Sequence, residues 1–405
     1  KLCEIIIMSV AVIGFMSHSV ELLLVVLFFM GTQSAFFGPV KYGYLPQHLD
    51  ESELVGGNGL VGMGTFLAIL TGMLIGGHLL NADVSGVWIS MLVLAIAVTG
   101  YMSARQIPLT PVVEPDMQIN WNIFLQTWRT LKLTRQTRTV FHCVIGISWF
   151  WFFGATFLVQ IPSYSQNVLG GDENLMSGLL ALFIVGISTG SLLCEKLSGK
   201  QVEIGLVPFG AIGLTLFGLD LFFASPAQPG AQVTFGAFLF EAANWRIIAD
   251  LMLIGVFGGF YIVPLYALVQ SRSAPDHRSR VIAGLNILNA LFMVIAAVMA
   301  MWVLGPVGLS IPELFLISAV LNAVVATYIF TLVPEFLMRF LVWLLIHTIY
   351  RVRVRGIENV PDQGPVIVAS NHVSFVDPLI LGGMIRRPVR FVMYHKIYDI
   401  PLLKF

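Results

Sequence analysis

The chain is dominated by ten continuous apolar runs, most of them about twenty residues long. A helix needs about 20 mostly apolar residues to cross a bilayer. Only helices and closed barrels satisfy their backbone groups in lipid, and a barrel would show alternating segments of about ten residues. The runs therefore predict an all-α polytopic membrane protein, with spans at 2–17, 20–40, 56–80, 84–104, 139–160, 174–195, 203–225, 246–270, 281–305 and 311–333.

The composition agrees with a membrane protein and excludes several other classes. Only 11% of the residues are charged, whereas soluble domains carry about 25%. The formal net charge is zero, which indicates no nucleic-acid partner. The three cysteines lie far apart within apolar runs, so neither a disulfide framework nor a metal site is predicted. We expect no metal and no cofactor.

Lysine and arginine between the runs predict the orientation. Twelve of them fall in one set of turns, and only Arg246 falls in the opposite set. Because cytoplasmic loops carry the excess of basic residues, both ends of the chain should face the cytoplasm. The twelve are Lys1, Lys41, Arg105, Arg129, Lys132, Arg135, Arg138, Lys196, Lys200, Arg272, Arg278 and Arg280.

Two stretches of the chain resemble each other. Residues 36–66 and residues 260–292 each hold a run ending near Pro and Tyr, a polar charged turn, and small residues with Asn opening the next run. Copies about 225 residues apart fit the parallel halves of a major facilitator transporter. With six spans in each half, the first two spans would be missing, which fits a chain that opens at the edge of a span. Alternatively, two unrelated units share these residues because turns favour Pro and charge.

The remaining segments complete the expected domain organisation. A transporter domain covers 1–333, and its two halves are joined by a loop at about 105–138. Within that loop, residues 119–138 carry Arg and Lys with Trp and Phe at helical spacing, typical of an amphipathic helix on the membrane surface. Residues 334–350 are apolar but short of a span, which favours an interfacial amphipathic helix or linker. A second domain starts at 351 and runs to 405.

Lys41 closely follows an apolar run, in "FFGPVKYGYLPQHL". It is either an anchor whose ammonium group reaches the membrane surface, or a cation that faces a cavity and meets an anionic headgroup. Pro39 removes a backbone donor and Gly43 permits unusual dihedrals, so we expect the helix to break here. Broken helices near ligands are common in transporters.

This stretch, with "ELVGGNGL" after it, resembles the lysophospholipid transporter family, a branch of the major facilitator superfamily. The matching residues are Gly38, Pro39, Lys41, Tyr42, Gly43 and Asn58. The resemblance implies that Lys41 binds the phosphate of a lysophospholipid, with Tyr42 and Asn58 as its neighbours in the cavity. It also implies a bacterial inner membrane as the location.

Gln33 and Asn286 are two further polar residues inside predicted spans. They either line a transport pathway or hydrogen-bond between helices, each such bond being worth about 0.6–2 kcal/mol.

The stretch "PVIVASNHVSFVDPLILGG" (365–383) has a different character. Its first six residues predict a buried strand, followed by His372, Asp377-Pro378 and an apolar helix. It resembles the glycerolipid acyltransferase family. The resemblance implies that His372 is the base that takes the hydroxyl proton and Asp377 its partner, since a carboxylate fixes the imidazole tautomer and stabilises the imidazolium. That family's later motifs do not occur before Phe405, so we expect an incomplete α/β domain.

Together these features predict a transporter that moves lysophospholipid to the cytoplasmic leaflet. A fused acyltransferase would then restore the second chain from acyl-ACP or acyl-CoA, so the expected partners are lysophospholipid, the acyl donor and membrane lipids. Two alternatives remain: an exporter of drugs or metabolites with an incidental tail, and a membrane anchor for a lipid-synthesis enzyme.

Overall fold

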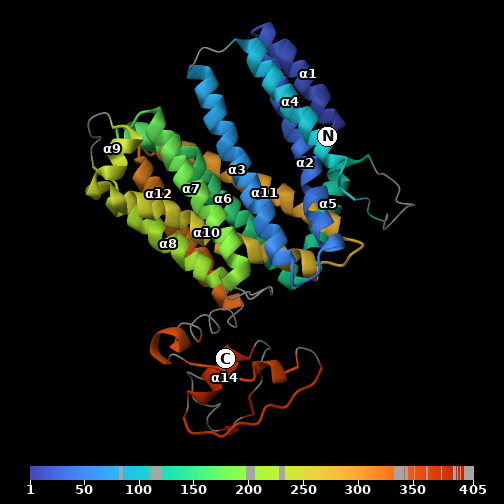
Figure 1. The fold of residues 1–405 in the computed structure, drawn as a ribbon, viewed down its shortest axis with the longest axis vertical. Helices are drawn as coiled ribbons and strands as arrows, with labels where there is room; N and C mark the ends of the chain where they lie inside the picture. Colours follow the sequence, from blue (N-terminus) through green and yellow to red (C-terminus); the bar gives the residue numbers. More distant parts are fainter. Residues whose placement is uncertain are drawn as a thin grey trace.

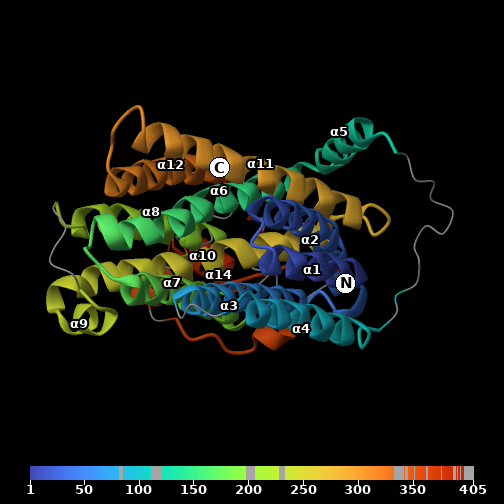
Figure 2. The same cartoon turned by 90° about the horizontal axis from the view of Figure 1, so that it is seen from above.

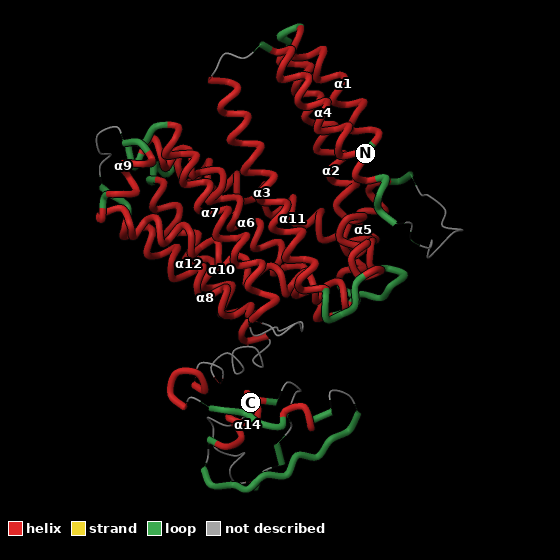
Figure 3. The backbone as a smooth tube through the Cα atoms, in the orientation of Figure 1, coloured by secondary structure: helices red, strands yellow, loops and turns green. Residues whose placement is uncertain are grey.

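A computed structural model describes most of the chain: residues 1–81, 85–108, 110, 121–197, 206–227, 233–332, 342, 345–350, 352–361, 364–374, 376–385, 389, 391–392 and 394–395. Helices make up most of these residues, and no strand is formed among them apart from one isolated bridge between Gly171 and Val233 (Figure 3). The all-helical class predicted for the membrane part is confirmed.

Each of the ten expected spans coincides with a helix. They are α1 (Leu2–Met16), α2 (Val20–His48), α3 (Leu54–Asn81), α4 (Gly86–Ala104), α6 (Arg138–Asn167), α7 (Glu173–Leu197), α8 (Leu206–Ala224), α10 (Trp245–Arg272), α11 (Arg278–Leu304) and α12 (Ile311–Leu332). Within the described ranges, nine helices are long and apolar enough to cross a membrane. The exception is α1, whose 15 residues fall short of the roughly 20 that a span needs.

The helices form two groups, α1–α4 and α6–α12, which Figures 1 and 2 show side by side. In the second group α10 packs against α7 and α8, and most of its residues are buried. In the first group α1 packs against α2 and α4, whereas α3 lies against α7 of the second group. The two groups therefore meet along α3 and α7, and also along α2 and α11.

Glycine allows α7 and α10 to approach closely. A Cβ atom added at Gly190 would collide with the backbone oxygen of Val256, and Gly186 and Gly255 face each other in the same way. Small residues drive helix association in lipid because they let backbones come into contact. The glycines of α7 and α10 therefore bring these two helices into backbone contact.

This packing gives a first testable prediction. Gly190→Ala should destabilise the protein by about 1–3 kcal/mol, because the clash is with backbone that cannot move aside cheaply. Gly154→Ala on α6 is the matched control: a Cβ there meets nothing within 4 Å, and alanine favours a helix by up to about 1 kcal/mol. Thermal unfolding of the full-length protein in detergent measures both. Equal melting temperatures for the two variants would contradict the prediction.

The amphipathic helix expected between the halves is present as α5 (Ile123–Thr134). Asn122 caps it by accepting a hydrogen bond from the Leu125 backbone N–H at 3.0 Å. Its end is anchored on α11, where Thr134 lies against Gly284. The apolar side chains of Phe124 and Trp128 are exposed, and Figure 2 shows α5 projecting from the bundle. An exposed apolar face on a basic helix is suited to the membrane surface.

The chain after α12 is described only in part. Most of the expected interfacial helix at 334–350 lies outside the described residues, and its end forms a short π-helical turn, Ile346–Tyr350. The buried strand expected at 365–370 is not formed, since these residues are exposed and have no regular structure. A strand needs a neighbouring strand for its hydrogen bonds, and none lies in the described part of the chain. The helix expected after it is α14 (Asp377–Met384).

Candidate functional site

Lys41 lies in the last third of α2, which runs without interruption through Pro39 and Pro46. The expected break of this helix near Pro39 and Gly43 is therefore wrong. Proline removes a single backbone hydrogen bond, and neighbouring helices make this tolerable in a membrane helix. Gly43 instead serves close packing, because a Cβ there would lie 3.0 Å from the Ser279 hydroxyl of α11.

The Lys41 ammonium group is half-buried between α2 and α3. Its Nζ donates a hydrogen bond to Thr65 Oγ1 at 3.3 Å and lies 4.8 Å from the centroid of the Tyr42 ring. Among the described residues no carboxylate forms an ion pair with it. A partly buried cation without a balancing carboxylate favours an anionic ligand, because burial of an unpaired charge is costly.

An aromatic wall extends from Lys41 across four helices. Tyr42 of α2 stacks on Tyr266 of α10, with ring centroids 4.6 Å apart and planes inclined by 11°. The Tyr266 hydroxyl accepts a hydrogen bond from Trp151 Nε1 of α6 at 3.4 Å, and Trp151 stacks against Phe66 of α3. Neither Tyr266 nor Trp151 is among the residues predicted from the sequence, because their contact with Tyr42 depends on how distant helices pack.

Asn58 is buried and bonds both to the Leu54 backbone oxygen of its own helix and to α10 of the second group, which we call the second half. Its Nδ2 donates to Gln270 Oε1 at 2.6 Å, and Gln270 Nε2 donates back to Asn58 Oδ1 at 3.1 Å and to the Tyr42 backbone oxygen at 3.0 Å. We call the group Tyr42, Asn58, Tyr266 and Gln270 the inter-half seam. Tyr42 contacts Lys41, whereas Asn58 bonds to Gln270, and in this conformation both join the two groups of helices.

The seam gives a second prediction. Asn58→Ala and Gln270→Ala each leave a buried amide without its partner, so their effects on the unfolding free energy should be non-additive by about 0.5–2 kcal/mol. Thermal unfolding of the two single variants and the double variant measures this coupling. The control pair is Asn58→Ala with Asn322→Ala, because Asn322 bonds to Trp149 and Thr215 instead. Additivity of the Asn58 and Gln270 variants would refute the seam.

The other two candidate polar residues take different places. Asn286 of α11 lies against Gly38 of α2, since a Cβ at Gly38 would stand 2.5 Å from Asn286 Nδ2. This contact fits the interhelical interpretation. Gln33 is half-buried on α2, two turns before Lys41. The structure brings Tyr42, Asn58 and Asn286 to one end of the interface between the halves and shows no contact of Gln33 with them.

The two similar stretches of sequence meet at this end of the bundle. The first forms the α2–α3 turn and the second the α10–α11 turn, so Tyr42 faces Tyr266 and Asn58 faces Gln270 across the seam. Nearby, the Glu195 carboxyl group of α7 lies against Gly56 in the first turn of α3. A carboxylate is favourable there because the N-terminus of a helix carries a partial positive charge.

His372 and Asp377 are brought together as expected. His372 Nδ1 lies 3.1 Å from Asp377 Oδ2, and the same oxygen accepts hydrogen bonds from the backbone N–H groups of Val373 and Ser374 at 2.6 and 2.7 Å. These backbone bonds, with the Ser374 bond first, hold the pKa of Asp377 below its ordinary value. The carboxylate therefore favours the imidazole tautomer with hydrogen on Nδ1, in which Nε2 carries the lone pair that takes a proton.

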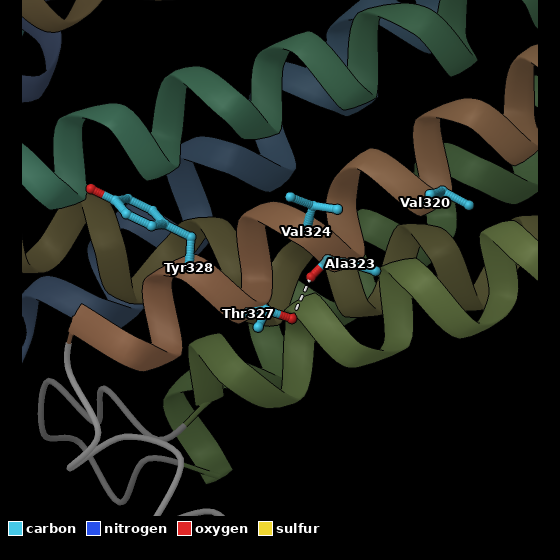
Figure 4. A pocket seen from close by; sticks show the side chains of 5 residues that line it. All are labelled: Val320, Ala323, Val324, Thr327 and Tyr328. Atoms are coloured by element: carbon cyan, nitrogen blue, oxygen red, sulfur yellow. Dashed lines mark hydrogen bonds between the residues drawn. The ribbon is translucent and has the colours of Figure 1, made fainter.

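A shallow apolar groove on α12 is unrelated to either site. It is lined by Val320, Ala323, Val324, Thr327 and Tyr328 (Figure 4). The Thr327 hydroxyl is satisfied by the Ala323 backbone oxygen at 2.8 Å, so the groove offers hardly any polar group to a ligand. Its lining fits contact with lipid chains.

Comparison with known families agrees with this arrangement. The chain matches the Major Facilitator Superfamily over residues 2–245 and the Acyltransferase family over residues 351–405. The chain belongs to the Major Facilitator Superfamily, and it carries an acyltransferase domain at its C-terminal end. It is a multi-pass membrane protein.

Curated relatives narrow the comparison. The chain is 31% identical over 252 residues to the lysophospholipid transporter LplT of Klebsiella pneumoniae. The aligned region covers 60% of this chain and 57% of that protein. It is similarly 31% identical over 255 residues to LplT of Cronobacter sakazakii, and 30% identical over 250 residues to LplT of Escherichia coli O157:H7. The chain thus spans about 57% of the length of these relatives.

Proposed function

We propose that the protein moves lysophospholipids across the bacterial inner membrane to the cytoplasmic leaflet, and that its acyltransferase domain re-acylates them there. The main observation in favour of transport is the half-buried Lys41. It lacks an ion-pair partner among the described residues and lies next to an aromatic wall. The similarity to LplT proteins supports the choice of substrate.

The chemistry of this site matches a lysophospholipid. Its phosphate is an anion that an ammonium group binds through charge-assisted hydrogen bonds. Its single acyl chain is apolar and suits the surfaces of Tyr42, Trp151 and Phe66. Asn58 and Asn286 reach the substrate only after the inter-half seam has separated, and Gln33 lines the pathway farther along α2.

We also propose the finer domain organisation. The transporter domain covers 1–333 with its inter-half loop at about 105–138, a linker covers 334–350, and the acyltransferase domain begins at 351. Two further spans would precede α1 in the first half. Supporting this, Gly64, Gly72, Gly76 and Gly77 of α3 have nothing within 4 Å of an added Cβ, and small residues in membrane helices are enriched where another helix packs.

We further propose that the end of the bundle that carries the seam faces the cytoplasm, as does the acyltransferase domain. The excess of Lys and Arg in the turns of that end supports this. In the α/β acyltransferase domain, His372 would take the proton from the glycerol hydroxyl as it attacks the thioester of acyl-ACP or acyl-CoA, and Asp377 would orient it. Fusion raises the effective concentration of the transported lipid at the enzyme.

Reconstitution of the full-length protein tests the proposal. Proteoliposomes with labelled lysophospholipid in the outer leaflet should lose the label from that leaflet faster than empty liposomes, and labelled diacyl phospholipid should show no such difference. With the acyl donor supplied on the domain's side, the moved lipid should gain a second chain. Transport of drug-like cations without lysophospholipid movement would favour an exporter, and acylation without any transport would favour a membrane anchor.

A further inference from the structure

A carboxylate is buried at the end of the second half that lies opposite the inter-half seam. Asp250 is on α10, five residues after Trp245, so it lies about 7.5 Å along the helix from its start. Asp250 is only 2% exposed, and its Oδ2 atom has no hydrogen-bond partner among the described residues. A buried carboxylate oxygen without a donor is costly in its ionised form.

A second carboxyl group lies beside it. Asp220, near the end of α8, interacts with Asp250 and forms an ion pair with Arg246. Arg246 Nε donates to Asp220 Oδ2 at 2.8 Å, and its Nη2 donates to Asp220 Oδ1. Arg246 also interacts electrostatically with Asp250 but forms its ion pair with Asp220, so one guanidinium group faces two carboxyl groups.

In the part of the chain that the structure describes, no ion pair joins Asp250 to another charged residue. From α6 it is approached by Tyr164, whose hydroxyl is bonded to Ser225 at 2.8 Å. The sequence of α7 holds no titratable residue between Glu173 and Cys194, and that of α12 holds none between Glu313 and Tyr328. Glu313 is engaged with the Ser310 backbone N–H at the start of α12.

We propose that the Asp220–Asp250 pair is a binding site for a single proton. Two carboxyl groups in contact cannot both be ionised without strong repulsion, and one shared proton removes it. The proton is bound to Asp250 and forms a hydrogen bond to a carboxylate oxygen of Asp220. Asp220 stays ionised because it is paired with Arg246. The proton has a route to the site, because the side chains of Asp220 and Arg246 are 36% and 51% exposed.

Infrared difference spectra of the full-length protein in lipid nanodiscs, recorded across a pH series, test this directly. We expect a carboxylic-acid carbonyl band that persists above the range in which exposed aspartates titrate, about pH 3.9. The band should be absent in Asp250→Asn. In Asp220→Asn its midpoint should move to lower pH by about one unit or more, because the like charge has been removed. Asp50→Asn, at an exposed aspartate, should leave it unchanged.

The outcomes separate cleanly. Absence of the band from the wild type, or its survival in Asp250→Asn, overturns the proposal. If Asp250→Asn fails to fold, the Asp220→Asn midpoint decides, and an unmoved midpoint is equally fatal. Loss of the band when sodium replaces choline at constant pH would show a metal cation in place of the proton and would also overturn it. None of these spectra needs lysophospholipid, so the result is independent of the proposed transport function.

Discussion

Lys41→Ala in the full-length protein is expected to slow lysophospholipid movement by at least about tenfold. A hydrogen bond to a charged group contributes about 1.5–3 kcal/mol, and 1.4 kcal/mol corresponds to a factor of ten. The half-buried ammonium group has no ion-pair partner among the described residues, so its removal takes away a ligand for phosphate without stranding a carboxylate. Proteoliposomes with labelled lysophospholipid in one leaflet measure the rate.

Lys132→Ala is the matched control, because it removes the same charge from an exposed position on α5. It should leave the rate within about twofold of wild type. Lys41→Arg should retain part of the activity, since it keeps the charge but changes the geometry of the donors. Normal transport by Lys41→Ala, in a variant with unchanged melting temperature, would eliminate Lys41 as the phosphate ligand.

His372→Ala is expected to lower acyl transfer by the full-length protein by about 10²–10⁴-fold, which is the contribution typical of a positioned general base. Lysophospholipid transport should be unaffected. His395→Ala provides the control, as it removes an exposed histidine from the same domain. Incorporation of labelled acyl groups measures the effect. An acylation rate equal to wild type in His372→Ala would reject the base assignment.

The partner of His372 should act over a defined pH range. The pKa of Asp377 is lowered in the folded protein by backbone N–H groups, so its interactions are fully present above its unfolded pKa and are lost as pH falls through the folded value. Asp377→Asn removes the negative charge at every pH. This variant should therefore lower acyl transfer at neutral pH, where the native carboxylate is ionised.

The membrane part could be predicted well because lipid imposes a simple rule on sequence. Every long apolar run became a helix, and the mixed basic and aromatic residues of 119–138 became α5. The predicted break at Pro39 failed because a single missing hydrogen bond does not interrupt a helix that neighbours support. The predicted strand at 365–370 failed because strand pairing depends on distant segments that a local pattern does not contain.

The candidate sites likewise contain residues that a local sequence pattern predicts and residues whose roles depend on distant parts of the chain. Proximity of His372 and Asp377 could be predicted because they are only five positions apart, with Asp377 at the start of a helix. Tyr266 and Gln270 escaped notice because their importance comes from residues more than 200 positions away in the chain. Asn58 was identified by its motif, but its hydrogen bonds to Gln270 appear only once the two halves are placed together.

The inter-half seam has a further consequence for how the protein responds to membrane voltage. Its contacts join two neutral amides, a backbone carbonyl and two stacked phenol rings. The energy that a membrane potential contributes to a movement scales with the charge moved, about 2.3 kcal/mol per elementary charge per 100 mV. Because none of these groups is charged, breaking the seam contacts adds no voltage dependence of its own, and any effect of membrane voltage on the opening should come from charged neighbours such as Lys41.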